Sequence, residues 1–339
     1  MKKIKIEEAI GMALAHDITR IIPGKSKGRA FRKGHVVRHE DIPDLIKLGK
    51  NHLYVLEISH KHLHEDDAAL RIAKAICGDH IRWTDPNEGK SGIVSEKDGL
   101  LKINAEGLFR INKIGNIIIS TLRDNFPCRK DQTVAATRII PLTIEKEKIE
   151  ELEAFAQAFL PVIRIMPYRK MKIGAVVTGT EIYKGLIQDE FDEFMGDKII
   201  SYGSEIAGKT IVPDDPGAIA DAIRAFADMG CDLIITTGGL SVDPDDATGN
   251  GIQQTKADII AYGAPILPGS MFLYAVLGNI PIMGLPACVY YNPITIFDLL
   301  FPRILAGDDI TADEIAGMGH GGLCMNCEPC RFPVCPFGK

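Results

Sequence analysis

Residues 231–248 read CDLIITTGGLSVDPDDAT and combine residue types that could hold a phosphate group together with a divalent cation. The β-branched run over 232–237 predicts a buried parallel strand. It is followed by two glycines, a serine and two acids, namely Gly238, Gly239, Ser241, Asp245 and Asp246. Glycines let a backbone approach a bulky group, N–H donors at a helix start suit an anion, and carboxylate oxygens suit Mg²⁺. The spacing predicts a phosphate–metal site, with a plain acidic helix start as the alternative.

Strand–helix alternation from residue 171 onward predicts the elements that would position this stretch. Strands are expected over 172–177, 209–212, 232–237 and 280–285, with another leading into Pro268. Helices are expected over about 189–202, 217–229, 248–257 and 293–305, with another between the segment at Pro268 and the strand at 280. This pattern predicts an α/β fold whose doubly wound, mostly parallel sheet lies between two helix layers. Ligands of such sheets bind outside the carboxyl ends of the strands, where residues 238–248 would lie.

Smaller α+β or β-rich modules are predicted ahead of this sheet. The expected boundaries are 1–65, 66–165, 170–310 for the α/β domain and 317–339 for a cysteine-rich tail. In the first module, Pro43 and Gly49 predict the start and end of a helix. The second module is expected to hold helices over 66–77 and 144–159 and strands over 100–103, 116–120 and 133–139.

Composition excludes several functional classes. The 339 residues are 46% hydrophobic and 25% charged, as in soluble globular proteins, and the net charge of −6 disfavours nonspecific nucleic-acid binding. Residues 259–297 carry no charged side chain, but five prolines interrupt them, which predicts buried strands and turns and no membrane span. The first residues lack the apolar core of a signal peptide, so a cytoplasmic location is expected.

Four loops in order resemble the molybdopterin-binding domain family, and the whole chain is most similar to MoeA/gephyrin-type molybdopterin molybdotransferases. The matching segments are Thr178-Gly-Thr-Glu181, Val212-Pro-Asp-Asp215, Thr237-Gly-Gly-Leu-Ser-Val242 with Asp246, and Pro268-Gly269 followed by Gly284-Leu-Pro286 and Asn292-Pro293. The resemblance is clear over about 170–307 and weaker over 1–60. It implies binding of molybdopterin or its adenylylated form, with molybdate insertion, Mg²⁺ and release of the nucleotide.

The resemblance also implies roles for individual residues. By position, the phosphate end of the pterin would contact Gly238, Gly239 and Ser241, and the pocket would be lined by Thr178, Gly179, Pro268, Gly269 and Ser270. Carboxylates for the cation or for positioning water would come from Glu181, Asp214, Asp245 and Asp246. A homo-oligomer and a molybdenum enzyme are the further partners compatible with this role.

Four departures from the family pattern keep other functions open. The lysine that usually follows Pro-Gly is replaced by Ser270 and Met271, and the usual Leu-Pro-Gly-Asn-Pro is stretched over 285–293. Asp243 stands in place of an expected glycine, and residues 189–191 stand where an asparagine is expected. A noncatalytic carrier or sensor is therefore one alternative. A nucleotide hydrolase is another, because the loop at 238–248 also resembles that of CinA-type proteins.

The tail carries the clearest metal-binding pattern in the chain. Cys324, Cys327, Cys330 and Cys335 have the spacing C-x₂-C-x₂-C-x₄-C, which predicts a Zn²⁺ ion or an iron–sulfur cluster. A thiol-rich disordered tail is the alternative.

Two further polar segments are weaker candidates. HKHLH over 60–64 fits a solvated face better than a metal site, and the basic loop over 25–33 fits either a solvated loop or an arm that contacts anions.

Overall fold

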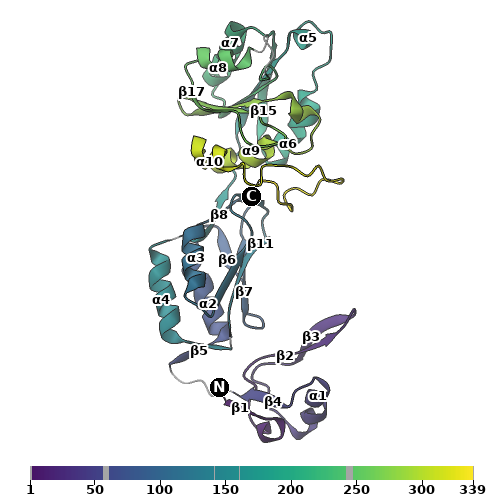
Figure 1. Ribbon diagram of the computed structural model, residues 1–339, viewed down its shortest axis with the longest axis vertical. Helices are drawn as coiled ribbons and strands as arrows, with labels where there is room; N and C mark the ends of the chain where they lie inside the picture. The colour runs from purple at the N-terminus through teal and green to yellow at the C-terminus, as the bar shows by residue number, and fades with distance from the viewer. Residues whose placement is uncertain (1, 56–60, 141, 160, 242–246, 339) are drawn as a thin grey trace. The chain divides into compact units, whose positions relative to one another are not determined.

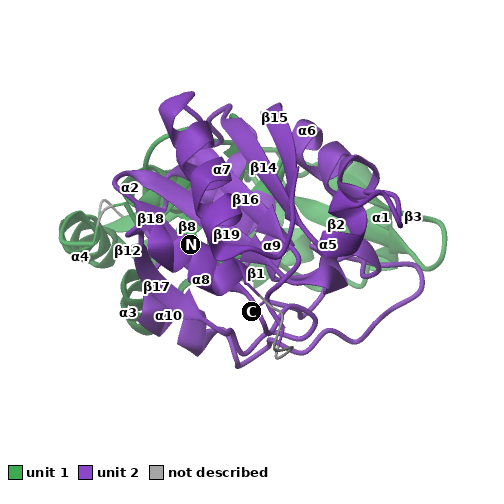
Figure 2. Ribbon diagram, turned by 90° about the horizontal axis from the view of Figure 1, so that it is seen from above, with its two compact units in different colours: residues 1–97, 101–122, 128–165 green, residues 98–100, 123–127, 166–339 purple. Residues whose placement is uncertain are grey.

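A computed structural model describes residues 2–55, 61–140, 142–159, 161–241 and 247–338. The chain divides into two compact units, coloured separately in Figure 2. Unit 1 comprises residues 1–97, 101–122 and 128–165, and unit 2 comprises residues 98–100, 123–127 and 166–339.

The start of unit 1 is built from short strands and helical turns. β1 (Lys2–Lys5) pairs antiparallel with β4 (His52–Val55), and β2 (Ile18–Ile22) forms a hairpin with β3 (Ser26–Phe31). The helical turns η1 (Ile6–Ala9) and η2 (His39–Asp41) precede α1 (Ile42–Lys47), which confirms the helix predicted from its proline and glycine signals. The basic segment that was expected to be a loop is mostly strand β3, because it pairs with β2. Three of its cations form ion pairs: Lys27 with Glu88 at 3.6 Å, Arg29 with Asp17 at 3.2 Å and Lys33 with Asp66 at 2.8 Å.

The rest of unit 1 is an α+β module, as predicted. Its antiparallel sheet has the order β6-β7-β11-β9. These strands are Ile81–Trp83, Lys90–Ser95, Thr133–Ile139 and Ile117–Thr121. Helices α2 (Glu65–Ile76), α3 (Ala105–Lys113) and α4 (Lys146–Gln157) accompany it, and α2 packs on the sheet. The other strands between residues 62 and 167, three of which include residues of unit 2, are β5 (His62–His64), β8 (Gly99–Ile103), β10 (Phe126–Cys128), β12 (Thr143–Glu145) and β13 (Ile163–Pro167).

Unit 2 contains one six-stranded sheet in the order β15-β14-β16-β19-β18-β17. These strands are Glu205–Val212, Lys172–Thr178, Leu233–Thr237, Ile280–Leu285, Leu273–Leu277 and Asp258–Tyr262. The first four pair in parallel, and the last two add antiparallel. The mostly parallel sheet predicted from the β-branched runs is thus confirmed.

Helices cover both faces of this sheet, as Figure 1 shows. On one face α7 (Pro216–Asp228) and α8 (Thr248–Gln254) pack on side chains that include Val176, Ile234 and Ile282. On the other face lie the π-helical turn η3 (Asp192–Gly196), α6 (Asp197–Ser201) and α9 (Ile296–Ala306). Successive strand residues point to opposite faces, so both layers bury an apolar surface. The three-layer αβα architecture follows.

The prediction of a helix between the segment at Pro268 and the strand that begins at residue 280 is wrong. Residues 273–277 form strand β18, which turns back at Gly278 and Asn279 to pair antiparallel with β19. The apolar run LYAVL has no helical period, and Gly278 adopts a φ of 64° that suits a tight turn. The uncharged stretch is therefore built of strands and turns, as expected. Among the described residues, no helix has the length and apolar character needed to cross a bilayer.

Candidate functional site at the carboxyl edge of the sheet

The carboxyl ends of the parallel strands meet at one edge of the unit 2 sheet. Thr178 pairs with Val212, Val177 with Thr237, and Thr237 with Leu285. The loops that follow these strands therefore start side by side. The loop over 263–272 reaches the same edge, since Leu273 at the start of β18 pairs with Gly284 near the end of β19. The structure thus brings the predicted segments at 178–181, 212–215, 238–241 and 268–270 to a common edge.

Three buried threonines hold this edge together. Thr178 Oγ1 lies 3.1 Å from both the Thr237 carbonyl oxygen and Thr248 Oγ1. Thr248 Oγ1 donates to the Gly238 carbonyl at 2.8 Å, and the Thr248 N–H donates to the Gly239 carbonyl at 3.1 Å. All three side chains are at most 3% exposed. The first residue of α8 is therefore tied directly to the end of β16.

Gly238 and Gly239 form a turn that requires glycine for two reasons. Their φ angles are 88° and 55°, in the region that side chains with a Cβ rarely adopt. A Cβ on Gly238 would lie 2.5 Å from the Thr178 carbonyl oxygen, and one on Gly239 would lie 2.6 Å from Thr248 Oγ1. Close packing of the protein on itself, in addition to any ligand, thus accounts for these two glycines.

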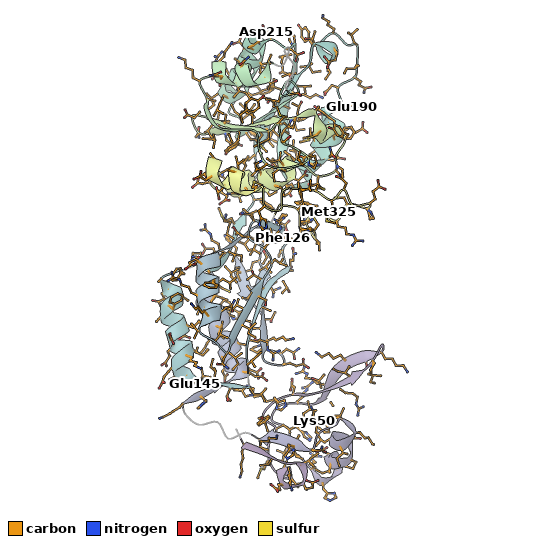
Figure 3. The ribbon with its side chains drawn as sticks, viewed as in Figure 1. Lys50, Phe126, Glu145, Glu190, Asp215 and Met325 are labelled. Atoms are coloured by element: carbon orange, nitrogen blue, oxygen red, sulfur yellow. The ribbon has the colours of Figure 1, made fainter. Side chains whose placement is uncertain are left out.

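The two predicted carboxylates in the described loops differ in their surroundings. Asp214 Oδ2 accepts the Thr180 N–H at 2.7 Å, and the Asp214 N–H donates to Thr180 Oγ1 at 3.2 Å. This reciprocal pair joins the loop after β15 to α5 (Thr180–Tyr183). Glu181 is exposed on α5. Asp215, labelled in Figure 3, caps α7 by accepting the Ala218 N–H at 2.8 Å.

The predicted cation ligands Asp245 and Asp246 lie outside the described residues. Ser241, the last described residue before them, is exposed. Within the described ranges, no three His, Cys, Asp or Glu side chains are arranged to hold a metal ion. Asp214 and Glu181 alone do not form a metal site, so binding of Mg²⁺ at this edge would also need the carboxylates of Asp245 and Asp246.

The segment Pro268-Gly269-Ser270 lies at this edge, and its glycine packs against Ile296. Gly269 is buried with a φ of 122°, and a Cβ there would lie 2.7 Å from Ile296 Cγ2. Ser270 accepts the Ala264 N–H through its carbonyl at 2.9 Å, and its side chain is half-buried. Gly269 thus serves the packing of this loop on α9, which leaves Pro268 and Ser270 as the half-buried residues of the segment.

Tyr290 belongs to this edge although the sequence analysis did not single it out. It lies on η4 (Ala287–Tyr290), which is formed by the stretched segment after β19, and its hydroxyl donates to Thr237 Oγ1 at 2.8 Å. Burial raises the pKa of Tyr290 to about 12. The Phe194 ring contacts it edge-on at 6.1 Å. Only the irregular spacing of the Leu-Pro to Asn-Pro segment could have drawn attention to it.

Asp189, at the position of the expected asparagine, has a structural role. Its carboxylate binds Lys209 Nζ at 2.6 Å and accepts the Phe191 N–H at 3.0 Å. Burial alone would lower the pKa of Lys209, but hydrogen bonds to Asp189 and Asp192 outweigh burial and raise it. This pairing fixes the start of η3 against β15.

A cavity that was not predicted lies at the opposite, amino end of the same strands. It measures about 480 Å³, and its polar lining includes Arg169, Asp232, Asn279 and Asp308. None of the predicted site residues lines it. No sequence motif marked it, because its residues come from separate loops.

The other two candidate metal sites, at the histidines near residue 60 and at the tail cysteines, differ from each other in their surroundings. His64 is 1% exposed and caps α2, with Nε2 2.5 Å from the Ala15 carbonyl and Nδ1 2.7 Å from Lys33 Nζ. It is therefore not on a solvated face as expected, and His60 lies outside the described residues. In the tail, Cys324, Cys327, Cys330 and Cys335 are free thiols that line a common cavity.

Comparison with known proteins gives two family matches. A family described as "Probable molybdopterin binding domain" matches residues 174–306, and a domain of unknown function matches residues 3–57. CinA-like proteins of Mycobacterium avium and Mycobacterium tuberculosis are 43% and 40% identical over 77 residues, which is 23% of this chain. The chain spans about 18% of the length of these curated relatives.

Solved structures to which this chain shows similarity include two molybdopterin biosynthesis proteins. The enzyme MoaB from Thermus thermophilus is 21% identical and covers 41% of this chain and 98% of its own, with a TM-score of 0.34. The MoeA protein from Pyrococcus horikoshii is 16% identical and covers 90% of this chain and 74% of its own, with a TM-score of 0.35. The sheet of unit 2 and the loops at its carboxyl edge therefore lie in a segment that matches the probable molybdopterin binding domain.

Proposed function

We propose that unit 2 binds molybdopterin, or its adenylylated form, at the carboxyl edge of its sheet and acts in molybdenum cofactor biosynthesis. The observation that carries the proposal is the Gly238–Gly239 turn, held between Thr178 and Thr248 within the segment that matches the molybdopterin-binding family. In open α/β sheets this edge is the usual ligand site. A turn fixed by buried hydrogen bonds presents its backbone without further ordering when a ligand arrives.

In this proposal each loop has its own part. The backbone around Gly238, Gly239 and Ser241 holds the phosphate end of the pterin. Thr178 and Gly179 line the pocket, and Pro268 and Ser270 border it from the antiparallel side of the sheet. Asp214, which is already hydrogen-bonded to α5, keeps the loop after β15 in place.

A more specific version of the proposal is that unit 2 also inserts molybdate into the bound pterin. Asp246, with Asp245, Asp214 or Glu181, would hold Mg²⁺ that bridges the carboxylates and the phosphate and offsets their repulsion. Ser270 and Met271 replace the cation that the related family usually provides. This replacement favours binding over full transferase activity, so the carrier form is retained beside the enzyme.

One assay separates these forms. The purified chain is mixed with adenylylated molybdopterin, molybdate and Mg²⁺, and AMP release and pterin retention are measured. AMP release that is lost in Asp246→Ala supports the transferase, and retention without AMP supports the carrier. If neither pterin binding nor AMP release is observed, the proposal is refuted.

A nucleotide hydrolase is a second candidate because the CinA-like relatives match part of this chain at 40–43% identity. Its loop would bind the pyrophosphate of a dinucleotide or of ADP-ribose through the same Gly238–Gly239 turn. The test is metal-dependent hydrolysis of ADP-ribose by the purified chain. Hydrolysis without pterin binding would select this candidate.

A further inference from the structure

The four cysteines of the tail converge on one small cavity in unit 2. Cys324, Cys327, Cys330 and Cys335 all line it, and its volume is about 30 Å³. A cavity needs roughly 10–15 Å³ of such volume to admit one water molecule, so this one has room for one small ion. Because none of the four is in a disulfide, all four sulfurs are available as ligands.

The turn between the first two cysteines directs a backbone N–H at the first sulfur. Asn326 has a φ of 51°, and its N–H donates to Cys324 Sγ at 3.4 Å. The left-handed residue also reverses the chain between Cys324 and Cys327, so that both line the same cavity.

A buried cation lies beside the last cysteine. Arg123 belongs to unit 2, and its guanidinium interacts electrostatically with Cys335. Its Nε is buried and has no hydrogen-bond partner among the described residues, while Nη1 donates to the Gly338 carbonyl. A cation at this place would offset part of the negative charge that four ligating thiolates bring together.

The ends of the tail are held more firmly than its middle. The Gly338 N–H donates to the Gly321 carbonyl at 3.0 Å, and the Cys324 N–H donates to the Leu267 carbonyl at 2.8 Å. Phe337 is buried, and Phe332 and Cys335 pack against the core of unit 2. Met325 and Val334 are more than 70% exposed, so their burial contributes little to ordering the middle of the tail. A metal centre supplies free energy for ordering small segments of this kind.

We propose that the four tail cysteines bind one thiophilic metal centre as thiolates and that this centre orders the tail. The shared chemistry is tetrathiolate ligation, which suits a single Zn²⁺ ion or an iron–sulfur cluster. The sulfurs are not yet in coordinating positions, since no group of three candidate ligands is found among the described residues. Binding therefore draws them together and releases one proton from each thiol that ionises.

The test measures zinc, iron and acid-labile sulfide in the full chain, purified without oxygen and then supplied with Zn²⁺ or with ferrous iron and sulfide. About one zinc per chain shows a single-ion site, and iron with sulfide in similar amounts shows a cluster; either outcome supports the proposal. A chain that retains neither metal overturns it.

Variants show where the metal is bound. Cys330→Ser should lose at least half of the bound metal, whereas Cys77→Ser should retain it, because Cys77 lies outside the tail and burial raises its thiol pKa to about 12. Circular dichroism checks that both variants fold. Where Cys330→Ser does not fold, Co²⁺ added to the unmodified chain should give the intense charge-transfer band of thiolate ligation. Equal metal content in both variants, or no such band, contradicts the assignment.

Discussion

Replacing Thr248 by valine should loosen the turn on which the proposed site depends. The Thr248 hydroxyl donates to the Gly238 carbonyl at 2.8 Å and lies 3.1 Å from Thr178 Oγ1, and the side chain is fully buried. Valine keeps the shape but removes both polar contacts, so the half-buried Gly238 carbonyl loses this partner. Such a loss costs about 1–3 kcal/mol of unfolding free energy.

The binding effect can be separated from this stability effect. Because the Gly238 carbonyl is the one released, the turn loses its fixed position, and we expect affinity for the pterin to fall about tenfold, equivalent to about 1.4 kcal/mol. Urea unfolding measures stability, and fluorescence of the pterin on titration measures affinity.

Thr255→Val is the matched control. Thr255 is the C-cap of α8 and is 6% exposed, and its Oγ1 donates to the Ile252 carbonyl at 2.6 Å. It should lose a similar amount of stability while keeping the affinity of the unmodified chain. If both variants bind equally well, or if both lose affinity equally, the turn does not have the role assigned to it.

Three further predictions rest on other described contacts. Gly238→Ala should lower the unfolding free energy by about 1–3 kcal/mol, because φ is 88° and the new Cβ would lie 2.5 Å from a carbonyl oxygen. Gly185 also has a positive φ but lies in open space, so Gly185→Ala should lower the unfolding free energy by less in the same urea titration. Tyr290→Phe should free Thr237 Oγ1 and weaken pterin binding in the fluorescence titration, and an absorbance titration should show that Tyr290 stays protonated to about pH 12. Burial raises the pKa of Glu65 from 4.5 to about 6, so the folded state binds the carboxyl proton more tightly than the unfolded state does. The unfolding free energy should therefore fall by about 2 kcal/mol as the pH rises from 4.5 to 6. Glu65→Gln should remove this pH dependence.

Each of these predictions has an outcome that contradicts it. Equal losses in Gly238→Ala and Gly185→Ala would mean that the close contact with Thr178 relaxes freely. Unchanged affinity in Tyr290→Phe would exclude its hydroxyl from the site. An identical pH slope in the Glu65→Gln variant would assign that slope to another group.

The central sheet could be predicted because its strands are short β-branched runs that end in glycine or proline. The predicted ranges 172–177 and 280–285 fall within β14 and β19, since both strands are buried on two faces. The common edge then follows from parallel pairing alone. Thr178 and Asp214 lie at that edge for this reason.

The errors arise where long-range pairing decides between strand and loop or helix. Residues 273–277 become a strand because β19 lies alongside, and 26–31 become a strand because β2 does. His64 looks polar and exposed in sequence, yet it is buried by contacts with Ala15 and Lys33, which lie far away along the chain. Helix α3 was missed because it is short and only Gly107 and Ile111 are buried on it.

Because hydrogen bonds hold the tail near both of its ends, cleavage in its middle should not release a fragment. Gly338 packs against Leu299 and is hydrogen-bonded to Gly321, and Phe337 beside it is only 3% exposed. Met325, labelled in Figure 3, lies between these clamps and is 72% exposed. A protease that cuts there would leave both ends attached, so the cleaved chain should migrate as one species on a native gel and release a short peptide only on denaturation.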